Sequence, residues 1–173
     1  MSKTINILIA MDTDRVKKDY KTPSKDSNKP TGIGHNYGYM IASGTTVISG
    51  QGTGDLNFNA LVGDTIRAFA VSGSDNFEDA VLLYGMPRFQ GDQVTSAFFY
   101  QDFVKSTVVA NGPSSPLPAK IVDEQFWFFQ ASVVKKGTES YKVQFGLWAR
   151  DETTGQPVLY GYFEWDPTIT VVG

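Results

Sequence analysis

The last third of the chain contains the pattern that most constrains its fold. Between residues 125 and 172, apolar side chains recur at every second position, and almost nothing favours a helix. The alternating positions are Tyr141, Val143, Phe145 and Leu147 before a turn-forming segment at 151–156, and Val158, Tyr160 and Tyr162 after it. Residues two apart in a strand share one face. The pattern therefore predicts strand–turn–strand structure with one face on a core.

Shorter strands are predicted in the rest of the chain. We expect them at 4–11, 39–42, 45–49, 55–61, 65–71, 81–84, 96–100 and 103–109. A short helical turn is predicted from Thr13 or Asp14, as the cap, to Tyr20. The proline-rich segment 111–118 is interpreted as a long connection between sheets. Together these elements predict an all-β fold: a two-sheet antiparallel β-sandwich, jelly-roll-like, with residues 1–173 forming one domain.

Composition narrows the classes of function. The chain has 173 residues, of which 41% are hydrophobic, and this is enough for a packed core without disulfides or metal. It has no Cys, which excludes disulfides, thiolate zinc sites and cysteine nucleophiles. The net charge is −3 and basic runs are short, so nucleic-acid partners are not expected.

The sequence also bears on where the protein is found. The apolar run Ile5–Met11 is too short for a signal peptide and is interrupted by Asn6. No segment approaches the roughly 20 apolar residues of a spanning helix, so membrane insertion is not expected. A cytoplasmic protein is predicted, with non-classical export as an alternative.

His35 is the single histidine, and it lies in the glycine-rich segment 31–36. A catalytic interpretation would need a nucleophile or a metal beside it, and no nucleophile-elbow motif is found in the sequence. The alternatives are an imidazole that hydrogen-bonds the backbone of its loop and, with Asn36, part of a ligand site. No catalytic residue is predicted.

Asp12 and Asp14 share the end of the first predicted strand. Oxygen-rich loops are what calcium needs, but the spacing after Asp12 does not follow the EF-hand pattern. The alternative is that these carboxylates cap a turn or are solvated. Calcium therefore remains open as a cofactor, and no other cofactor is predicted.

Aromatic residues beside Asp166 near the C-terminus allow two interpretations. Trp165, Tyr160 and Tyr162 could stack on a sugar, or they could fill the core of a sandwich. A carboxylate pair for glycoside hydrolysis, Glu164 with Asp166, is only weakly indicated. The candidate ligand-binding residues are Asp12, Asp14, His35, Asn36, Trp165 and Asp166.

Several segments, taken in order along the chain, carry a family resemblance. They are Asn28–Ile33 with His35-Asn36, Ser49–Thr53, Gly91–Val94, Gln144–Leu147, and Tyr160–Phe163 with Trp165–Pro167. In this order the chain resembles the AidA/PixA inclusion-body protein family of bacteria. The resemblance implies a small protein without established enzymatic activity, in some members controlled by quorum sensing or growth phase and in some accumulating as intracellular inclusions.

The expected function is therefore that of a non-enzymatic accessory protein. It would act through self-association or ligand binding, with edge strands and exposed aromatics supplying a homo-oligomeric interface. The alternative is a carbohydrate-binding protein, a lectin, with a glycan site on end loops and calcium as an optional cofactor.

Overall fold

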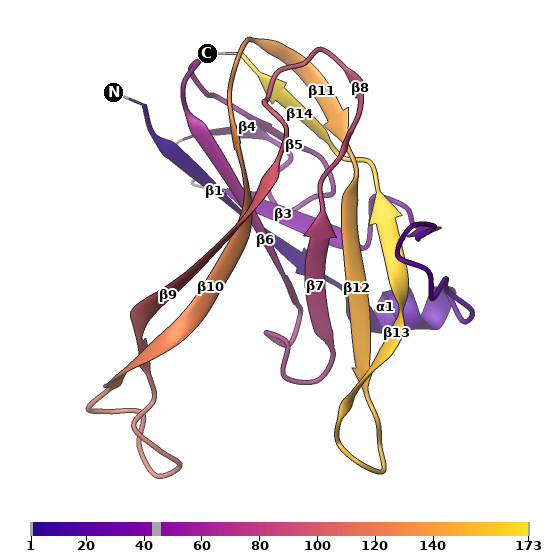
Figure 1. The fold of residues 1–173 in the computed structure, drawn as a ribbon, viewed down its shortest axis with the longest axis vertical. Coiled ribbons are helices and arrows are strands. Elements are labelled where there is room, and N and C mark those ends of the chain that lie inside the picture. The colour runs from indigo at the N-terminus through magenta and orange to yellow at the C-terminus, as the bar shows by residue number, and fades with distance from the viewer. Residues whose placement is uncertain (1, 43–45, 173) are drawn as a thin grey trace.

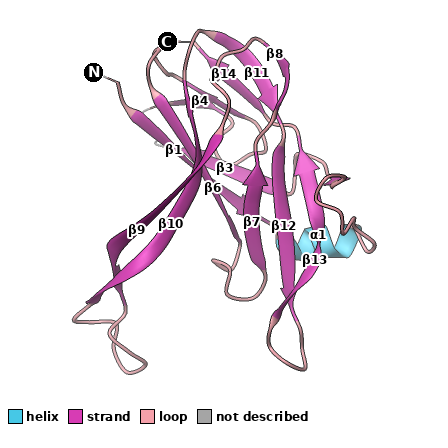
Figure 2. Ribbon diagram, viewed as in Figure 1, coloured by secondary structure: helices cyan, strands magenta, loops and turns pink. Residues whose placement is uncertain are grey.

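The computed structural model describes residues 2–42 and 46–172, and it is almost entirely β-structure (Figures 1 and 2). The described residues contain one short helix, α1 (Thr13–Asp19), and three sheets. The prediction of a mostly β fold with a short helical turn is confirmed. The start of the strand predicted at 45–49 lies outside the described residues.

The first sheet combines strands from both halves of the chain. In spatial order it contains β3 (Gly38–Ala42), β1 (Thr4–Met11), β6 (Thr65–Ser72), β10 (Lys120–Ser132) and β9 (Phe99–Val109). β1 and β6 run parallel, and the other pairs are antiparallel. β1 has the predicted bounds, and in β6 the predicted face of Ile66, Ala68 and Ala70 is buried.

Two smaller sheets complete the fold. One contains β4 (Val47–Ser49), β5 (Leu56–Phe58), β14 (Thr168–Val171), β11 (Gly137–Tyr141) and β8 (Arg88–Gly91). The other contains β2 (Thr31–Gly32), β13 (Pro157–Trp165), β12 (Val143–Arg150) and β7 (Ala80–Gly85). Buried hydrophobic side chains from all three sheets form one cluster.

The predicted two-sheet, purely antiparallel, jelly-roll-like sandwich is not confirmed. The strands form three sheets, and three of the pairings, β1 with β6, β2 with β13, and β5 with β14, are parallel. Alternation reports which face of a strand is buried and carries no information about the direction of its neighbour. Parallel pairs need long crossover connections, and the chain supplies these between β1 and β6.

The alternating series in the last third is confirmed before the turn and is wrong after it. Tyr141, Val143, Phe145 and Leu147 are all buried, although a break at Lys142 divides them between β11 and β12. In β13 the buried positions are Gly161, Phe163 and Trp165, and the predicted face of Val158, Tyr160 and Tyr162 is exposed or half-buried. The register decides this, because Phe163 lies opposite Phe145 and so shares its face.

The N-cap of α1 is Asp12, one residue before Thr13, the first of the two predicted caps. The side chain of Asp12 accepts a hydrogen bond from the backbone N–H of Arg15, at 3.1 Å, and so caps the helix. Val16 is fully buried, as its place on the apolar face predicts. No helix in the described part of the chain has the length and hydropathy to cross a membrane.

The largest departure from the sequence-based expectation is a long hairpin, here called the arm: β9, β10 and the loop 110–119 between them. Segments 96–100 and 103–109 were predicted as separate strands, but Phe99–Val109 is one strand. The segment 111–118 is the tip of this hairpin and does not connect two sheets, because β9 pairs with β10 from Phe99 to Val109, over its whole length. Figure 1 shows the arm projecting away from the third sheet.

Candidate functional site

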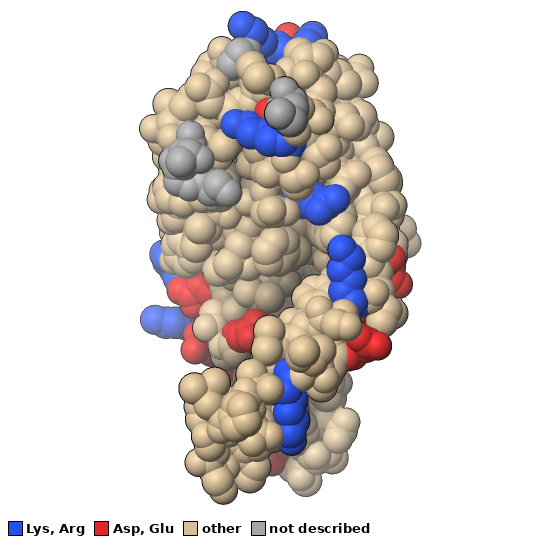
Figure 3. Space-filling model, turned by 90° about the vertical axis from the view of Figure 1, so that its left-hand side faces the viewer, with Lys and Arg blue, Asp and Glu red and all other residues tan. Residues whose placement is uncertain are grey.

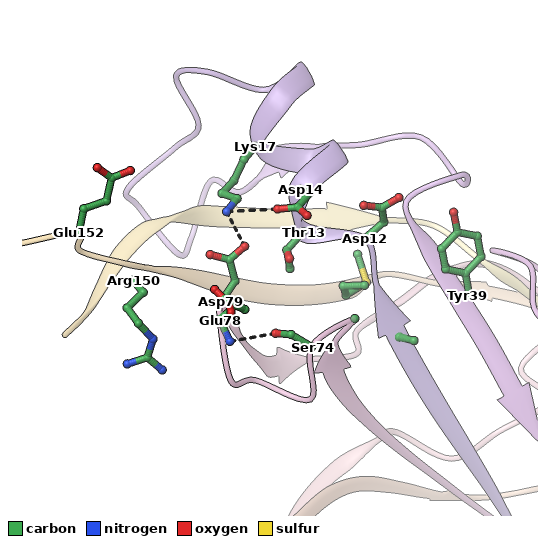
Figure 4. A pocket seen from close by; sticks show the side chains of 13 residues that line it. Asp12, Thr13, Asp14, Lys17, Tyr39, Ser74, Glu78, Asp79, Arg150 and Glu152 are labelled. Carbon is green, nitrogen blue, oxygen red and sulfur yellow. Dashed lines mark hydrogen bonds and ion pairs between the residues drawn. The ribbon is translucent and has the colours of Figure 1, made fainter. Parts of the chain in front are cut away.

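A polar pocket lies where α1 meets the ends of three other segments (Figure 4). Asp12 and Asp14 come from the start of α1, Glu78 and Asp79 from the loop before β7, and Glu152 follows β12. The pocket has a volume of about 670 Å³ and is open to solvent. Two of the six predicted ligand-binding residues, Asp12 and Asp14, therefore share one concave site.

Lys17 lines this pocket and is held by two carboxylates. Its Nζ lies 2.6 Å from Asp79 Oδ2 and 3.5 Å from Asp14 Oδ1. Partial burial alone would lower the pKa of Lys17, but the hydrogen bond from its ammonium to Asp79 and the charge of that carboxylate raise it above the ordinary value. The ammonium is therefore a fixed positive centre between Asp79 and Asp14.

The second cation at the pocket is also engaged. Arg150 donates from Nε and Nη2 to the backbone carbonyl of Phe77, at 3.1 and 2.6 Å, and from Nη1 to that of Gly155, at 2.6 Å. The carboxylates of Asp14 and Glu152 are exposed and can accept hydrogen bonds. The pocket thus presents hydrogen-bond acceptors beside two cations that are already engaged.

Calcium has no geometric support in this pocket. Among the described residues, no three His, Asp or Glu side chains are grouped so that they could hold a metal ion. Calcium takes six to eight oxygen ligands, which two neighbouring aspartates do not approach.

His35 lies in a second polar cluster. Its Nδ1 is 3.1 Å from Asp55 Oδ2, and its Nε2 is 3.7 Å from Asp166 Oδ1. Asp55 also accepts a hydrogen bond from the backbone N–H of Thr168, which ties the cluster to β14. The imidazole thus contacts two carboxylates, and the predicted residues His35 and Asp166 lie together.

The other two predicted residues are placed differently. Trp165 is 2% exposed, packs edge-on against Phe145, and donates from Nε1 to the carbonyl of Gly54. Its ring is part of the core, so a sugar cannot stack on it in this conformation. Asn36 is exposed beside His35, and its backbone carbonyl accepts a hydrogen bond from Arg15 Nη1.

Sequence reasoning did not find the surface of the arm. Large apolar side chains of the arm are partly or largely exposed on both faces: Tyr100, Val104, Val108 and Ile121 on the inner face, which is turned towards β7, and Phe99, Phe103 and Phe126 on the outer face. Val104 is 72% exposed and Ile121 is 78% exposed. A possible signal was Asn111-Gly112, a strong turn dipeptide between two apolar stretches.

The inner face of the arm borders a groove. The groove has a volume of about 420 Å³ and is lined by Leu82 and Tyr84 of β7 and by Tyr100 and Trp127 of the arm. Tyr100 and Trp127 stack with their ring centroids 6.5 Å apart. β7 and β9 are both end strands of their sheets, so the groove lies beside two unpaired strand edges.

The fold and these surfaces define a small β-rich protein with an open polar pocket and a protruding apolar hairpin. The family model for PixA, described as inclusion body protein, matches residues 3–171, and the chain therefore belongs to this family. Its description names inclusion bodies and no reaction. The resemblance noted in the sequence is confirmed.

A solved structure supports the same assignment. The chain is similar to the inclusion body protein of the PixA family from Burkholderia cenocepacia J2315, known from a crystal structure, with 26% sequence identity and a TM-score of 0.84. The similarity covers 99% of this chain and 97% of that one. A comparison with curated protein sequences gave no match.

Proposed function

We propose that this protein is a non-enzymatic, self-associating member of the PixA family and that the arm forms its interface. One observation carries the proposal: the arm exposes large apolar side chains on both of its faces. Soluble monomers rarely expose a contiguous apolar surface of this kind, and such surfaces mark interaction sites. Self-association would remove this surface from water.

The free edge of β9 supports the same proposal. β9 is the end strand of the first sheet, has 11 residues and lacks proline. Its only charged residues are Asp102 and Lys105. Natural edge strands are usually short, charged or interrupted by proline, because a long apolar edge pairs with other strands. An 11-residue edge with two charges is suited to pairing.

The charges of β9 favour a second copy of the chain as the partner. If two β9 strands pair antiparallel about Phe103, Asp102 lies opposite Val104 and Lys105 opposite Gln101. No like charges then face each other across the ladder, where they would be destabilising. A twofold axis through Phe103 gives a closed, self-complementary interface. Such a dimer would be the building unit of a larger assembly.

Sedimentation velocity over a wide concentration range tests this proposal. We expect the wild-type chain to sediment faster as its concentration rises. Val104→Asp puts a charge in the interface, and we expect it to weaken association by about tenfold or more. Val158→Asp is the matched control, because Val158 is also exposed but lies on β13, outside the arm.

Two results would contradict the proposal. The first is a wild-type chain that stays monomeric up to high micromolar concentration. The second is a Val104→Asp variant that associates as strongly as the wild type and the Val158→Asp control. Circular dichroism of the three proteins checks that each one is folded.

The polar pocket supports a second candidate function, carbohydrate binding. Asp12, Asp14 and Glu152 line the pocket with carboxylate oxygens, which can accept hydrogen bonds from sugar hydroxyls. Tyr39 also lines the pocket. A glycan array, probed with and without calcium, tests this candidate. Binding that Asp14→Asn removes would support it, and no bound glycan in either condition would reject it.

A further inference from the structure

We propose that the outer face at the base of the arm is a binding site for an amphiphilic carboxylate, such as a fatty acid. This site, here called the outer hollow, has a volume of about 560 Å³. Its lining includes Arg67, Phe69, Phe103, Lys105, Phe126 and Phe128. The volume is within the usual range for small-molecule sites. The self-association proposed above pairs the free edge of β9, whereas the outer hollow lies on one face at the base of the arm, so the two proposals are tested by separate variants.

The aromatic floor of the outer hollow follows from the register of the arm. Phe103 lies directly opposite Phe126, so the two rings project from the same face of the hairpin. Phe128 stacks on Phe103 with ring centroids 5.8 Å apart and planes inclined by 25°. Phe103 and Phe126 each remain 41% exposed. Covering these rings with a hydrocarbon chain would release water from apolar surface.

Arg67 is fixed at the side of this floor. Its guanidinium lies over the ring of Phe128, 4.7 Å from the centroid, and its Nε donates to Gln130 Oε1 at 2.8 Å. These two contacts orient the planar group without using a carboxylate partner. A guanidinium held in this way can bind a ligand carboxylate through two parallel hydrogen bonds.

The outer hollow contains two cations and no acidic lining residue. Within the described residues, no Asp or Glu oxygen lies within 4.0 Å of a side-chain nitrogen of Arg67 or Lys105. Glu124 lies opposite Lys105 in the ladder but makes no ion pair with it. Figure 3 shows this side of the molecule, where basic side chains lie on a mostly uncharged surface, with acidic side chains beside some of them in the lower half. In a chain of net charge −3, this local arrangement selects an anion.

The two sets of contacts together define the class of ligand. The hydrocarbon part would lie on Phe103 and Phe126, the carboxylate would bind Arg67, and Lys105 would add positive charge nearby. A cationic amphiphile would gain the same apolar contacts but would be repelled by both cations. The proposal therefore predicts discrimination by the sign of the head group.

Calorimetric titration of the full chain with dodecanoate, below its critical micelle concentration, tests this inference. Dodecyltrimethylammonium is the matched ligand control, because it has the same chain and the opposite charge. We expect dodecanoate to bind and the cation to bind at least about tenfold more weakly. No binding of dodecanoate, or equal binding of the two amphiphiles, would overturn the proposal.

Variants locate the binding on the protein. Arg67→Gln should weaken dodecanoate binding about tenfold, whereas Lys18→Gln, an equal loss of charge at an exposed position of α1, should leave it unchanged. If Arg67→Gln fails to fold, Lys105→Gln makes the same test with a smaller expected loss. Unchanged affinity in the folded variants would contradict the assignment. Val104→Asp should keep wild-type binding, which separates this result from any failure of self-association.

Discussion

Two hairpins of this protein, β12–β13 and β9–β10, have similar secondary structure and opposite surroundings. In the first, Phe145 and Phe163 are fully buried, and their rings stack 5.4 Å apart in the core. In the second, rings of the same kind, such as Phe103 and Phe126, are 41% exposed. Large apolar side chains therefore build the core in one hairpin and form surface in the other.

The comparison shows that a hairpin need not be stabilised along its whole length by the core. The arm is fixed at its base, where Phe129 and Ala131 are buried and β10 pairs with β6. Further out it is held by the ladder between β9 and β10 and by contacts between its own side chains. Side chains on a projecting ladder of this kind bury little surface on folding. Substitutions there should therefore change binding to other molecules more than the stability of the fold.

The largest effect expected is on core packing. Phe145→Ala should lower the free energy of unfolding by about 3–5 kcal/mol, because it leaves a cavity in the core. Phe126→Ala in the arm, the matched control, should lower it by less than about 1 kcal/mol, because the ring is already partly in water. Urea denaturation of both variants checks this, and equal losses would contradict the comparison.

The next effect concerns the segment that leads into the arm. Glu139 is buried, and its Oε2 accepts hydrogen bonds from the backbone N–H groups of Val94 and Thr95, both at 2.8 Å. Glu139→Ala leaves these donors without a partner, so we expect a loss of about 3 kcal/mol in urea denaturation. A loss below about 0.5 kcal/mol would show that the segment is held in another way.

A smaller effect should appear at acid pH. Burial alone would raise the pKa of Asp64, but hydrogen bonds from the backbone N–H groups of Leu61 and Lys3 hold it below its ordinary value of 3.8. The stabilisation from this carboxylate is complete above pH 3.8 and is lost as the pH falls through the lower, folded-state pKa.

Thermal unfolding of the wild type and of Asp64→Asn as a function of pH measures this contribution. We expect the wild type to be more stable near neutral pH and the difference between the two proteins to shrink as the pH falls below 3.8. A difference that does not depend on pH would show that the charge of Asp64 is not responsible.

The smallest effect on stability is expected at the exposed face of the arm. Val104→Asp should change the free energy of unfolding by no more than about 0.5 kcal/mol, measured at a concentration where the chain is monomeric. The side chain of Val104 is 72% exposed, so little of its surface is buried against the core. A loss of several kcal/mol would mean that the arm is packed against the rest of the chain.

The same comparison explains how much of the fold could be predicted. The alternation at 141–147 and at 65–71 predicted buried faces correctly, because in those strands one face meets the core and the other does not. In the arm, Phe103 and Val104 are adjacent and point to opposite faces. Both faces therefore look apolar, and periodicity does not predict which face is buried. Pairing directions and the number of sheets depend on long-range contacts, which local patterns do not encode.

The candidate sites were predictable to a smaller extent. Asp12 and Asp14 were recognised as neighbours at a strand end, but Asp79, which shares Lys17 with Asp14, comes close to them only through folding. Trp165 was interpreted as a ligand-binding aromatic or a core residue, and the structure places it in the core. The outer hollow joins Arg67 of β6 to Phe103 of β9, and it depends on both being paired with β10.

Amide hydrogen exchange of the wild-type chain at low and high concentration tests the role of the arm most directly. If β9 forms the interface, the backbone amides of 99–109 should exchange more slowly at high concentration, while those of the core strand 157–165 should not change. Equal exchange of β9 at both concentrations, in samples whose sedimentation shows association, would contradict the account, because the copies would then meet through another surface.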